Sequence, residues 1–169
     1  MQTLKSGDKA PSFTLLNQHN ESIALDSFAG KKVLAYFYPK AMTPGCTTQA
    51  QNLRDHITAL TELNVEVLGI SPDEVVRLTK FSDRDELNFS LLSDPDHAVA
   101  DAFGIWGLKK FMGKEYDGIH RLSFLIDEQG VIEHVFTSAT LKAVPLEGEY
   151  SKFKTKDHHQ VVLDYLAAK

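Results

Sequence analysis

A continuous apolar run, Val33 to Tyr38, constrains the fold more than any other segment of the chain. Its residues do not alternate between apolar and polar, so the strand that it predicts must be covered on both faces. A helical pattern follows after a short loop, with apolar residues at Ala50, Leu53, Ile57 and Leu60. A second apolar strand, Val65 to Ile70, comes next. A strand, a helix and a strand in this order predict a right-handed crossover between parallel strands.

The flanking segments predict further strands and helices around this centre. Residues Pro11 to Leu25 have the pattern of a hairpin with a polar turn, and Asp26 to Gly30 a turn or single helical turn. Ser71-Pro72-Asp73-Glu74 has the chemistry of a helix start, with Ser71 as the cap and Pro72 in the first helical position. A short strand, Phe89 to Leu92, precedes a helix that ends at Gly104, with Val99, Ala102 and Phe103 expected to face inward.

The last part of the chain predicts a second hairpin and a closing helix. The expected strands are Leu122–Asp127 and Val131–Phe136, joined by the turn residues Glu128-Gln129-Gly130. The closing helix runs from about Asp157 to Ala167. The prediction is therefore an α/β chain with a thioredoxin-like fold, a mixed central sheet flanked by helices with an N-terminal β-hairpin. We expect residues 1–169 to form a single domain.

Composition excludes several classes of function. Lys plus Arg is 18 and Asp plus Glu is 23, giving a net charge of -5, so the chain lacks the basic patch that nucleic acids and anionic membranes require. No apolar run approaches the length of a bilayer span, and the N-terminus has no signal-peptide pattern. We therefore expect a cytoplasmic protein. The seven histidines show no metal-ligand spacing, so we expect ordinary surface or helix-end histidines and no metal.

Cys46 is the only cysteine, which excludes a disulfide within the chain. Thr43 is a suitable N-cap and Pro44 suits the first helical position, so Cys46 is expected in the first turn of a helix. Unpaired N–H groups and the helix dipole favour an anion there, and the thiolate is the reactive form of cysteine. The residues alone leave a second interpretation open, in which Cys46 is a small buried apolar side chain.

The segment Pro39-x-x-x-Thr43-x-x-Cys46 matches the P-x-x-x-T-x-x-C signature of peroxiredoxins. The resemblance extends over Leu4 to about Phe136 and over Lys154 to Leu166, and it is closest to the bacterioferritin comigratory protein (Q-type) branch. The further matching segments are Phe37–Thr47, Asp94, Phe103–Gly107, Phe111–Lys114 and Gly118–Asp127. The resemblance implies a thiol-dependent peroxidase that reduces hydrogen peroxide and organic hydroperoxides without a cofactor.

The resemblance also implies a role for each residue of the site. Cys46 resembles the peroxidatic cysteine, whose thiolate attacks the peroxide and becomes a sulfenic acid. Thr43 resembles the hydroxyl that contacts thiolate and peroxide, and Pro39 the proline that shields the thiolate from water. Arg121 resembles the distal arginine that stabilises the thiolate and the leaving oxygen. From its position one turn into the helix, we expect Gln49 to brace Arg121 by a hydrogen bond.

The chain departs from the family pattern in two places. Gln51 stands where many members of this branch have a resolving cysteine, and residues 73–86, where others have it, contain none. Oxidised Cys46 is therefore expected to react with an external thiol (glutathione, glutaredoxin or thioredoxin) or with Cys46 of a second copy. We expect the protein to be a monomer or a weak homodimer. Residues 140–150 resemble a loop insertion, either inert or a contact for a partner.

Three alternatives remain open at this point. A disulfide oxidoreductase on the same fold needs C-x-x-C, but Thr43 occupies the first of those positions. A non-catalytic thioredoxin-like binding module would not need Thr43, Cys46 and Arg121 together. A peroxide sensor would share the first chemical step and differ only in what reacts with the sulfenic acid.

Overall fold

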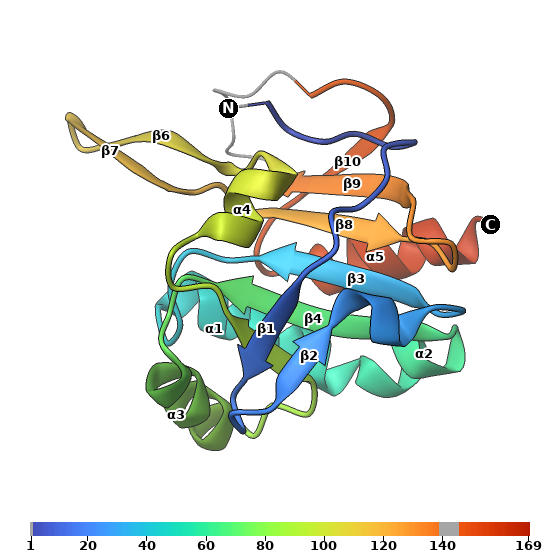
Figure 1. Ribbon diagram of the computed structural model, residues 1–169, viewed down its shortest axis with the longest axis horizontal. Coiled ribbons are helices and arrows are strands. Elements are labelled where there is room, and N and C mark those ends of the chain that lie inside the picture. Colours follow the sequence, from blue (N-terminus) through green and yellow to red (C-terminus); the bar gives the residue numbers. More distant parts are fainter. Residues whose placement is uncertain (1, 139–145) are drawn as a thin grey trace.

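The computed structural model describes residues 2–138 and 146–169, and an eight-stranded mixed sheet forms its centre (Figure 1). The strand order is β10-β9-β8-β3-β4-β5-β1-β2. The strands are β1 Thr14–Asn17, β2 Ser22–Ala24, β3 Lys32–Phe37, β4 Val65–Ser71, β5 Ser90–Ser93, β8 Leu122–Ile126, β9 Ile132–Ser138 and β10 Tyr150–Phe153. The α-helices are α1 Pro44–Asp55, α2 Ile57–Glu62, α3 Val75–Asp85, α4 Ala98–Phe103 and α5 His158–Ala167, and a 3-10 helix, η1, covers Leu25–Phe28.

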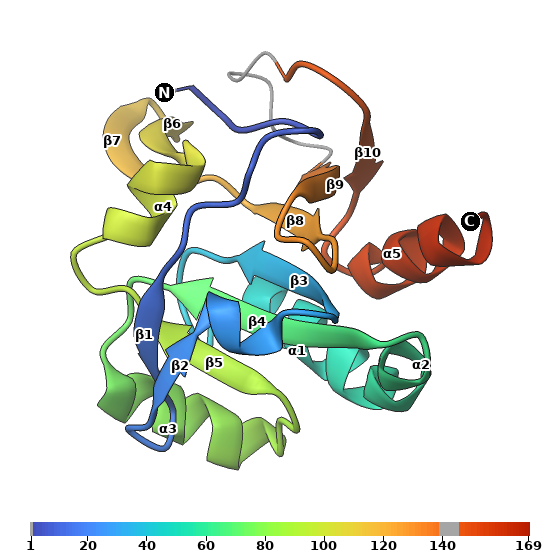
Figure 2. The same ribbon diagram turned by 45° about the vertical axis from the view of Figure 1, so that its right-hand side comes forward.

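The central strand β3 confirms the prediction from its apolar run. It pairs in parallel with β4 and antiparallel with β8, so that both of its edges are hydrogen-bonded within the sheet. Alternate residues of β3 face two separate cores. Leu34 and Tyr36 pack with apolar residues of α1, α2, α3 and α5, whereas Val33, Ala35 and Phe37 pack with α4, η1 and the N-terminal segment. Figure 2 shows α1, α2 and α5 together on one side of the sheet and α4 on the other.

The expected thioredoxin-like arrangement is observed, including the N-terminal hairpin β1–β2 and the second hairpin β8–β9. The helix after β3 differs from the prediction because it is interrupted. At His56 the backbone leaves the helical conformation, and the ring Nδ1 lies 2.8 Å from the carbonyl oxygen of Asn52. The apolar stripe predicted for one helix is therefore shared between α1 and α2.

Two helix predictions were wrong in detail. Ser71 does not cap α3; it ends β4, its hydroxyl donates to the Asp73 carboxylate, and the helix begins only at Val75. Ser71 does not act as the cap because its hydroxyl bonds to a nearby carboxylate instead of helix N–H groups. In α4, Val99 and Phe103 are buried as predicted, but Ala102 is exposed.

Three further strands were not predicted. β6 (Trp106–Phe111) and β7 (Lys114–Ile119) form a separate two-stranded sheet that projects from the body of the protein (Figure 1). β10, Tyr150–Phe153, pairs in parallel with β9 at the edge of the main sheet, so the expected loop over residues 140–150 ends in a strand. The first part of that expected loop, residues 140–145, lies outside the described residues. In the described part of the chain, no helix is long and apolar enough to cross a bilayer.

Candidate active site

Cys46 lies in the first turn of α1, where this helix begins after the carboxyl end of β3. Thr43 is the N-cap residue and Pro44 the first helical residue, as predicted. The Thr43 hydroxyl does not bond to the helix N–H groups. It donates instead to the carbonyl oxygen of Lys40 at 2.8 Å. The N–H groups of the first turn therefore lack a side-chain cap from Thr43.

Arg121 is the residue immediately before β8, and its guanidinium reaches the sulfur of Cys46. The Nη2 atom donates to Cys46 Sγ at 3.2 Å, and the Nη1 atom donates to Gln49 Oε1 at 2.6 Å. The two hydrogen bonds fix the guanidinium with respect to α1. The hydrogen bond expected between Gln49 and Arg121 is therefore present. The guanidinium keeps its charge at any ordinary pH, so it places a permanent cation beside the sulfur.

The side chains around this pair are tightly enclosed. Cys46 is 1% exposed and Gln49 is 1% exposed. Gly45 lies between Pro44 and Cys46 and has no side chain beside the guanidinium. A Cβ atom at this position would be in van der Waals contact with Arg121 Nη2, at 3.6 Å, and with Thr155 Cγ2, at 3.7 Å. Pro39 lies half-buried in the loop that leads from β3 to α1. The chain thus brings Pro39, Thr43, Cys46, Gln49 and Arg121 to one end of β3.

Aromatic side chains lie on the core side of the site. The rings of Tyr36 and Tyr38 stack with centroids 5.4 Å apart, and both residues are buried. Burial raises the pKa of both hydroxyls well above the ordinary value, and negative charge on Cys46 raises them further. Both hydroxyls are therefore neutral, and they add no anion that would oppose a thiolate at Cys46.

Lys109 of β6 is a charged neighbour that sequence reasoning missed. Its Nζ atom donates to the carbonyl oxygen of Ile119 at 2.8 Å, which anchors the side chain at the base of the projecting hairpin. Burial lowers the pKa of Lys109, the charge of Arg121 lowers it further, and negative charge on Cys46 raises it. No sequence signal identified this lysine, because its position depends on a hairpin whose strands were not predicted.

His158 corrects the expectation of surface or helix-end histidines. It begins α5 but is fully buried; its Nε2 atom lies 2.7 Å from Ser123 Oγ, and its ring contacts Phe153 and Tyr36. Burial lowers the pKa of His158 to about 3, and the charge of Arg121 acts in the same direction. The imidazole is therefore neutral behind the site. His120, between β7 and β8, and His134 of β9 are buried as well.

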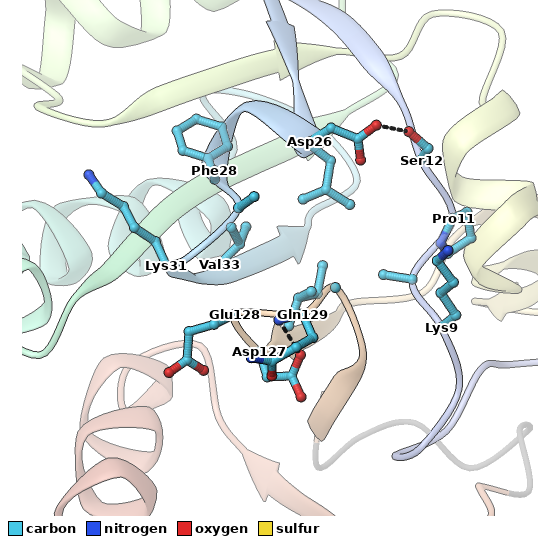
Figure 3. Close-up of a pocket in the computed structure, with 15 residues that line it drawn as sticks. Lys9, Pro11, Ser12, Asp26, Phe28, Lys31, Val33, Asp127, Glu128 and Gln129 are labelled. Atoms are coloured by element: carbon cyan, nitrogen blue, oxygen red, sulfur yellow. Dashed lines mark hydrogen bonds between the residues drawn. The ribbon is translucent and has the colours of Figure 1, made fainter.

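A cavity of about 770 Å³ lies elsewhere, at the other end of β3 (Figure 3). It is lined by the N-terminal segment, η1 and the β8–β9 turn, and Pro11, Phe28 and Glu128 are among the lining residues. None of the five predicted site residues lines this cavity. Among the described residues, no group of three or more His, Cys, Asp or Glu side chains could hold a metal ion.

The arrangement at Cys46 suits nucleophilic chemistry by sulfur. A cation at 3.2 Å and a helix N-terminus both stabilise negative charge on the sulfur. The same donors can stabilise negative charge that develops on an oxygen bound next to the sulfur. Burial strengthens these interactions because it removes water that would screen them.

Comparisons with known proteins point to the same chemistry. The AhpC/TSA family matches residues 6–135. The chain is 57% identical to a putative peroxiredoxin bcp of Haemophilus influenzae, over 98% of each chain. It is 53% identical to peroxiredoxin Bcp of Escherichia coli K12, over 98% of this chain and 97% of the relative. Among solved structures, a cysteine-to-serine mutant of Xanthomonas campestris peroxiredoxin Q superposes with a TM-score of 0.82 and 28% identity, over 98% and 99% of the two chains.

Proposed function

Because this chain belongs to the AhpC/TSA family and to its Bcp (Q-type) peroxiredoxins, we propose a role for each residue at Cys46 in the reduction of peroxides. The protein is a thiol-dependent peroxidase, with peroxide as substrate and a thiol as reductant. The observation that carries the assignment of the site is the guanidinium of Arg121, which bonds at once to Cys46 Sγ and Gln49 Oε1.

In the first step, the Cys46 thiolate attacks the terminal oxygen of a hydroperoxide. The new S–O bond uses an electron pair of sulfur, the O–O bond breaks, and its electron pair leaves with the other oxygen. Cys46 is thereby oxidised to a sulfenic acid, and the leaving alkoxide or hydroxide takes up a proton to become an alcohol or water. The substrates that we propose are hydrogen peroxide and organic hydroperoxides.

Each neighbouring residue has a separate role in that step. Arg121 stabilises the thiolate and the charge that develops on the leaving oxygen. Gln49 holds the guanidinium in place through the 2.6 Å hydrogen bond. The Thr43 hydroxyl forms a hydrogen bond with the peroxide, and Pro39 limits the access of water to the sulfur. The reaction needs no metal or organic cofactor, because the sulfur itself is oxidised.

The second step requires a thiol from another molecule, because Cys46 is the only cysteine in the sequence. The external thiol attacks the sulfenic sulfur, water leaves, and a mixed disulfide forms; a second thiol then releases reduced Cys46. We propose glutathione as the first thiol and a glutaredoxin as the second. The support is that Cys46 is 1% exposed, so a tripeptide reaches the sulfur with less rearrangement than a folded protein requires. Thioredoxin, or Cys46 of a second copy, is the alternative.

We propose further that the chain acts as a single domain in the cytoplasm, as a monomer or weak homodimer. A free thiol as the reactive group agrees with a reducing compartment.

Peroxide consumption tests this function. The wild-type protein and C46S are each given hydrogen peroxide or an organic hydroperoxide, with glutathione alone, with glutathione and glutaredoxin, or with thioredoxin and its reductase. We expect turnover by the wild type and none by C46S, with the highest rate when glutathione and glutaredoxin are present. Equal consumption by wild type and C46S would refute the role of Cys46. Turnover with thioredoxin alone would refute the proposed reductant but not the peroxidase function.

A further inference from the structure

The loop between β3 and α1 carries Thr43 and leads into Cys46, yet it belongs to no helix or strand. Buried backbone groups in such a loop need hydrogen-bond partners. Ala41 lies in this loop and is fully buried. Its N–H donates to Asp73 Oδ2 at 2.8 Å, and its carbonyl oxygen accepts from Arg77 Nη2 at 2.7 Å. Both polar backbone groups of Ala41 are thus bonded to side chains more than thirty positions away.

Asp73 and Arg77 also hold each other. Arg77 Nε lies 3.2 Å from Asp73 Oδ1, so Ala41, Asp73 and Arg77 form a closed ring of contacts, which we call the Ala41 clamp. The Ser71 hydroxyl donates to Asp73 Oδ2 at 2.8 Å. The Ser93 hydroxyl donates to the backbone carbonyl oxygen of Asp73 at 2.6 Å. A buried carboxylate with this many partners has a defined position.

The residue after Ala41 shows why the loop needs such support. Met42 has a φ of +68°, a left-handed conformation that is strained for a residue with a side chain. Such a conformation persists only where the surrounding structure fixes it. Thr43 follows directly in an extended conformation and is the N-cap residue of α1. The direction in which the chain enters Thr43 therefore depends on how Ala41 is held.

We propose that Asp73 and Arg77 are positioning residues for peroxide reduction, which act through the backbone of Ala41 to set the place of the Thr43 hydroxyl relative to Cys46. This inference rests on the proposed function, because it concerns the same reaction. Neither residue needs to touch the peroxide. Their effect reaches the site through Ala41 and Met42, and an error of about 1 Å in the placement of reacting groups can lower a rate a hundredfold.

Arg77 is the better of the two for mutation. Its side chain is 38% exposed, whereas that of Asp73 is 8% exposed, so removal of the guanidinium leaves a site that water can enter. R77M should therefore fold. K80M is a matched control, because Lys80 is an exposed cation of the same helix and the substitution removes the same charge. R77K keeps a charged donor that can reach one of the two partners.

Two rates separate positioning from a general loss of structure. One is the rate at which reduced protein reacts with hydrogen peroxide, and the other is the rate at which iodoacetamide alkylates Cys46. Alkylation needs the thiolate but not the hydroxyl of Thr43. We expect R77M to lower the peroxide rate about tenfold while the alkylation rate stays near that of the wild type. K80M should change neither rate, and R77K should restore part of the peroxide rate. Equal losses in both rates would contradict the proposal.

A double-mutant cycle with T43V tests the pathway through Thr43. If the clamp acts by placing this hydroxyl, R77M should lower the peroxide rate of T43V by much less than it lowers that of the wild type. Fully independent effects of the two substitutions would overturn the proposal. A wild type that does not reduce peroxide would refute the proposed function instead, and the two failures are therefore distinguishable.

Discussion

Gln51 of α1 donates a hydrogen bond from Nε2 to the Asp85 carboxylate at the end of α3, with a distance of 3.0 Å to Oδ1. Asp85 is buried, and its second oxygen accepts from Arg84 Nε at 2.9 Å. Arg84 in turn donates to the Thr47 hydroxyl at 2.9 Å. A polar network therefore joins α3 to α1 within one turn of Cys46. Many members of the Q-type branch have a resolving cysteine at this position, and here Gln51 connects the two helices instead.

A thiol at position 51 should restore internal resolution, but only if α1 opens. Five residues along an α-helix correspond to about 7.5 Å of rise and 140° of rotation, which is too far for a disulfide. We expect Q51C, after one equivalent of peroxide, to form an internal disulfide with loss of helical circular dichroism. Q51S is the control, because it also loses the amide but gains no thiol.

The same pair of variants tests over-oxidation. With excess peroxide and no reductant, sulfinic acid at Cys46 should accumulate in the wild type and in Q51S more than in Q51C, as measured by intact mass. Equal accumulation in all three would mean that the introduced thiol never reaches the sulfenic acid.

Removal of the guanidinium at position 121 should impair the reaction more than any other change outside Cys46. R121M loses the donor at 3.2 Å from the sulfur, and we expect a peroxide rate lower by a factor of about 10²–10³. The rate at which iodoacetamide alkylates Cys46 at a fixed neutral pH should also fall, since the cation beside the sulfur is gone. K31M, a loss of charge near the other end of β3, should change neither quantity.

The brace formed by Gln49 should contribute less than the group that it holds. Q49M removes the acceptor of Arg121 Nη1 with little change in volume, and we expect a fall in the peroxide rate of about tenfold. In an R121M background the same substitution should have almost no further effect, because the guanidinium is already absent. Q160M on the exposed side of α5 provides the control for a glutamine-to-methionine change.

Stability should fall in mild acid because of His158. The unfolded imidazole takes up a proton near pH 6.5, but the folded one does so only near its pKa of about 3. Between these values the unfolded state binds more protons, so the free energy of unfolding decreases as the pH falls from about 6.5 to about 3. The lowered pKa values of His120, His134 and His159 act in the same direction.

The variant H158Q isolates this contribution. In urea titrations at a series of pH values, it should show a shallower dependence on pH than the wild type, by at most about 1.4 kcal/mol per pH unit for one proton. H19Q, which replaces an exposed histidine, should keep the wild-type slope. Identical slopes for H158Q and the wild type would show that His158 is not held neutral in the folded state.

The sequence predicted the centre of the fold because its signals are local. The apolar run of β3 and the Thr43-Pro44 start of α1 each consist of a few neighbouring residues. Together they correctly predicted that Cys46 lies in the first turn of α1. Arg121 and Gln49 are 72 positions apart, and their pairing was expected from the family resemblance together with helical periodicity.

Other features could not be predicted, for physical reasons. The hairpin β6–β7 buries little of its length, so its side chains do not alternate clearly between core and solvent. β10 pairs in parallel with β9, and no local turn signals such a partner. Ser71 and Asp73 have the residue types of a helix start, but tertiary contacts with Ala41 and Arg77 use them differently. Such clamp contacts depend on where α3 packs, which no short segment encodes.

The most direct test of the account is the intact mass of the protein after one equivalent of hydrogen peroxide. The reaction is run with and without a trap for sulfenic acid, and with glutathione in a parallel sample, and C46S is treated in the same way. The account predicts rapid formation of one trapped adduct at Cys46, replaced by a single glutathione adduct when glutathione is present, and no adduct on C46S. A covalent dimer would mean that two copies of Cys46 react with each other. No modification of Cys46 within minutes would contradict the central claim that Arg121 and the start of α1 activate this thiol towards peroxide.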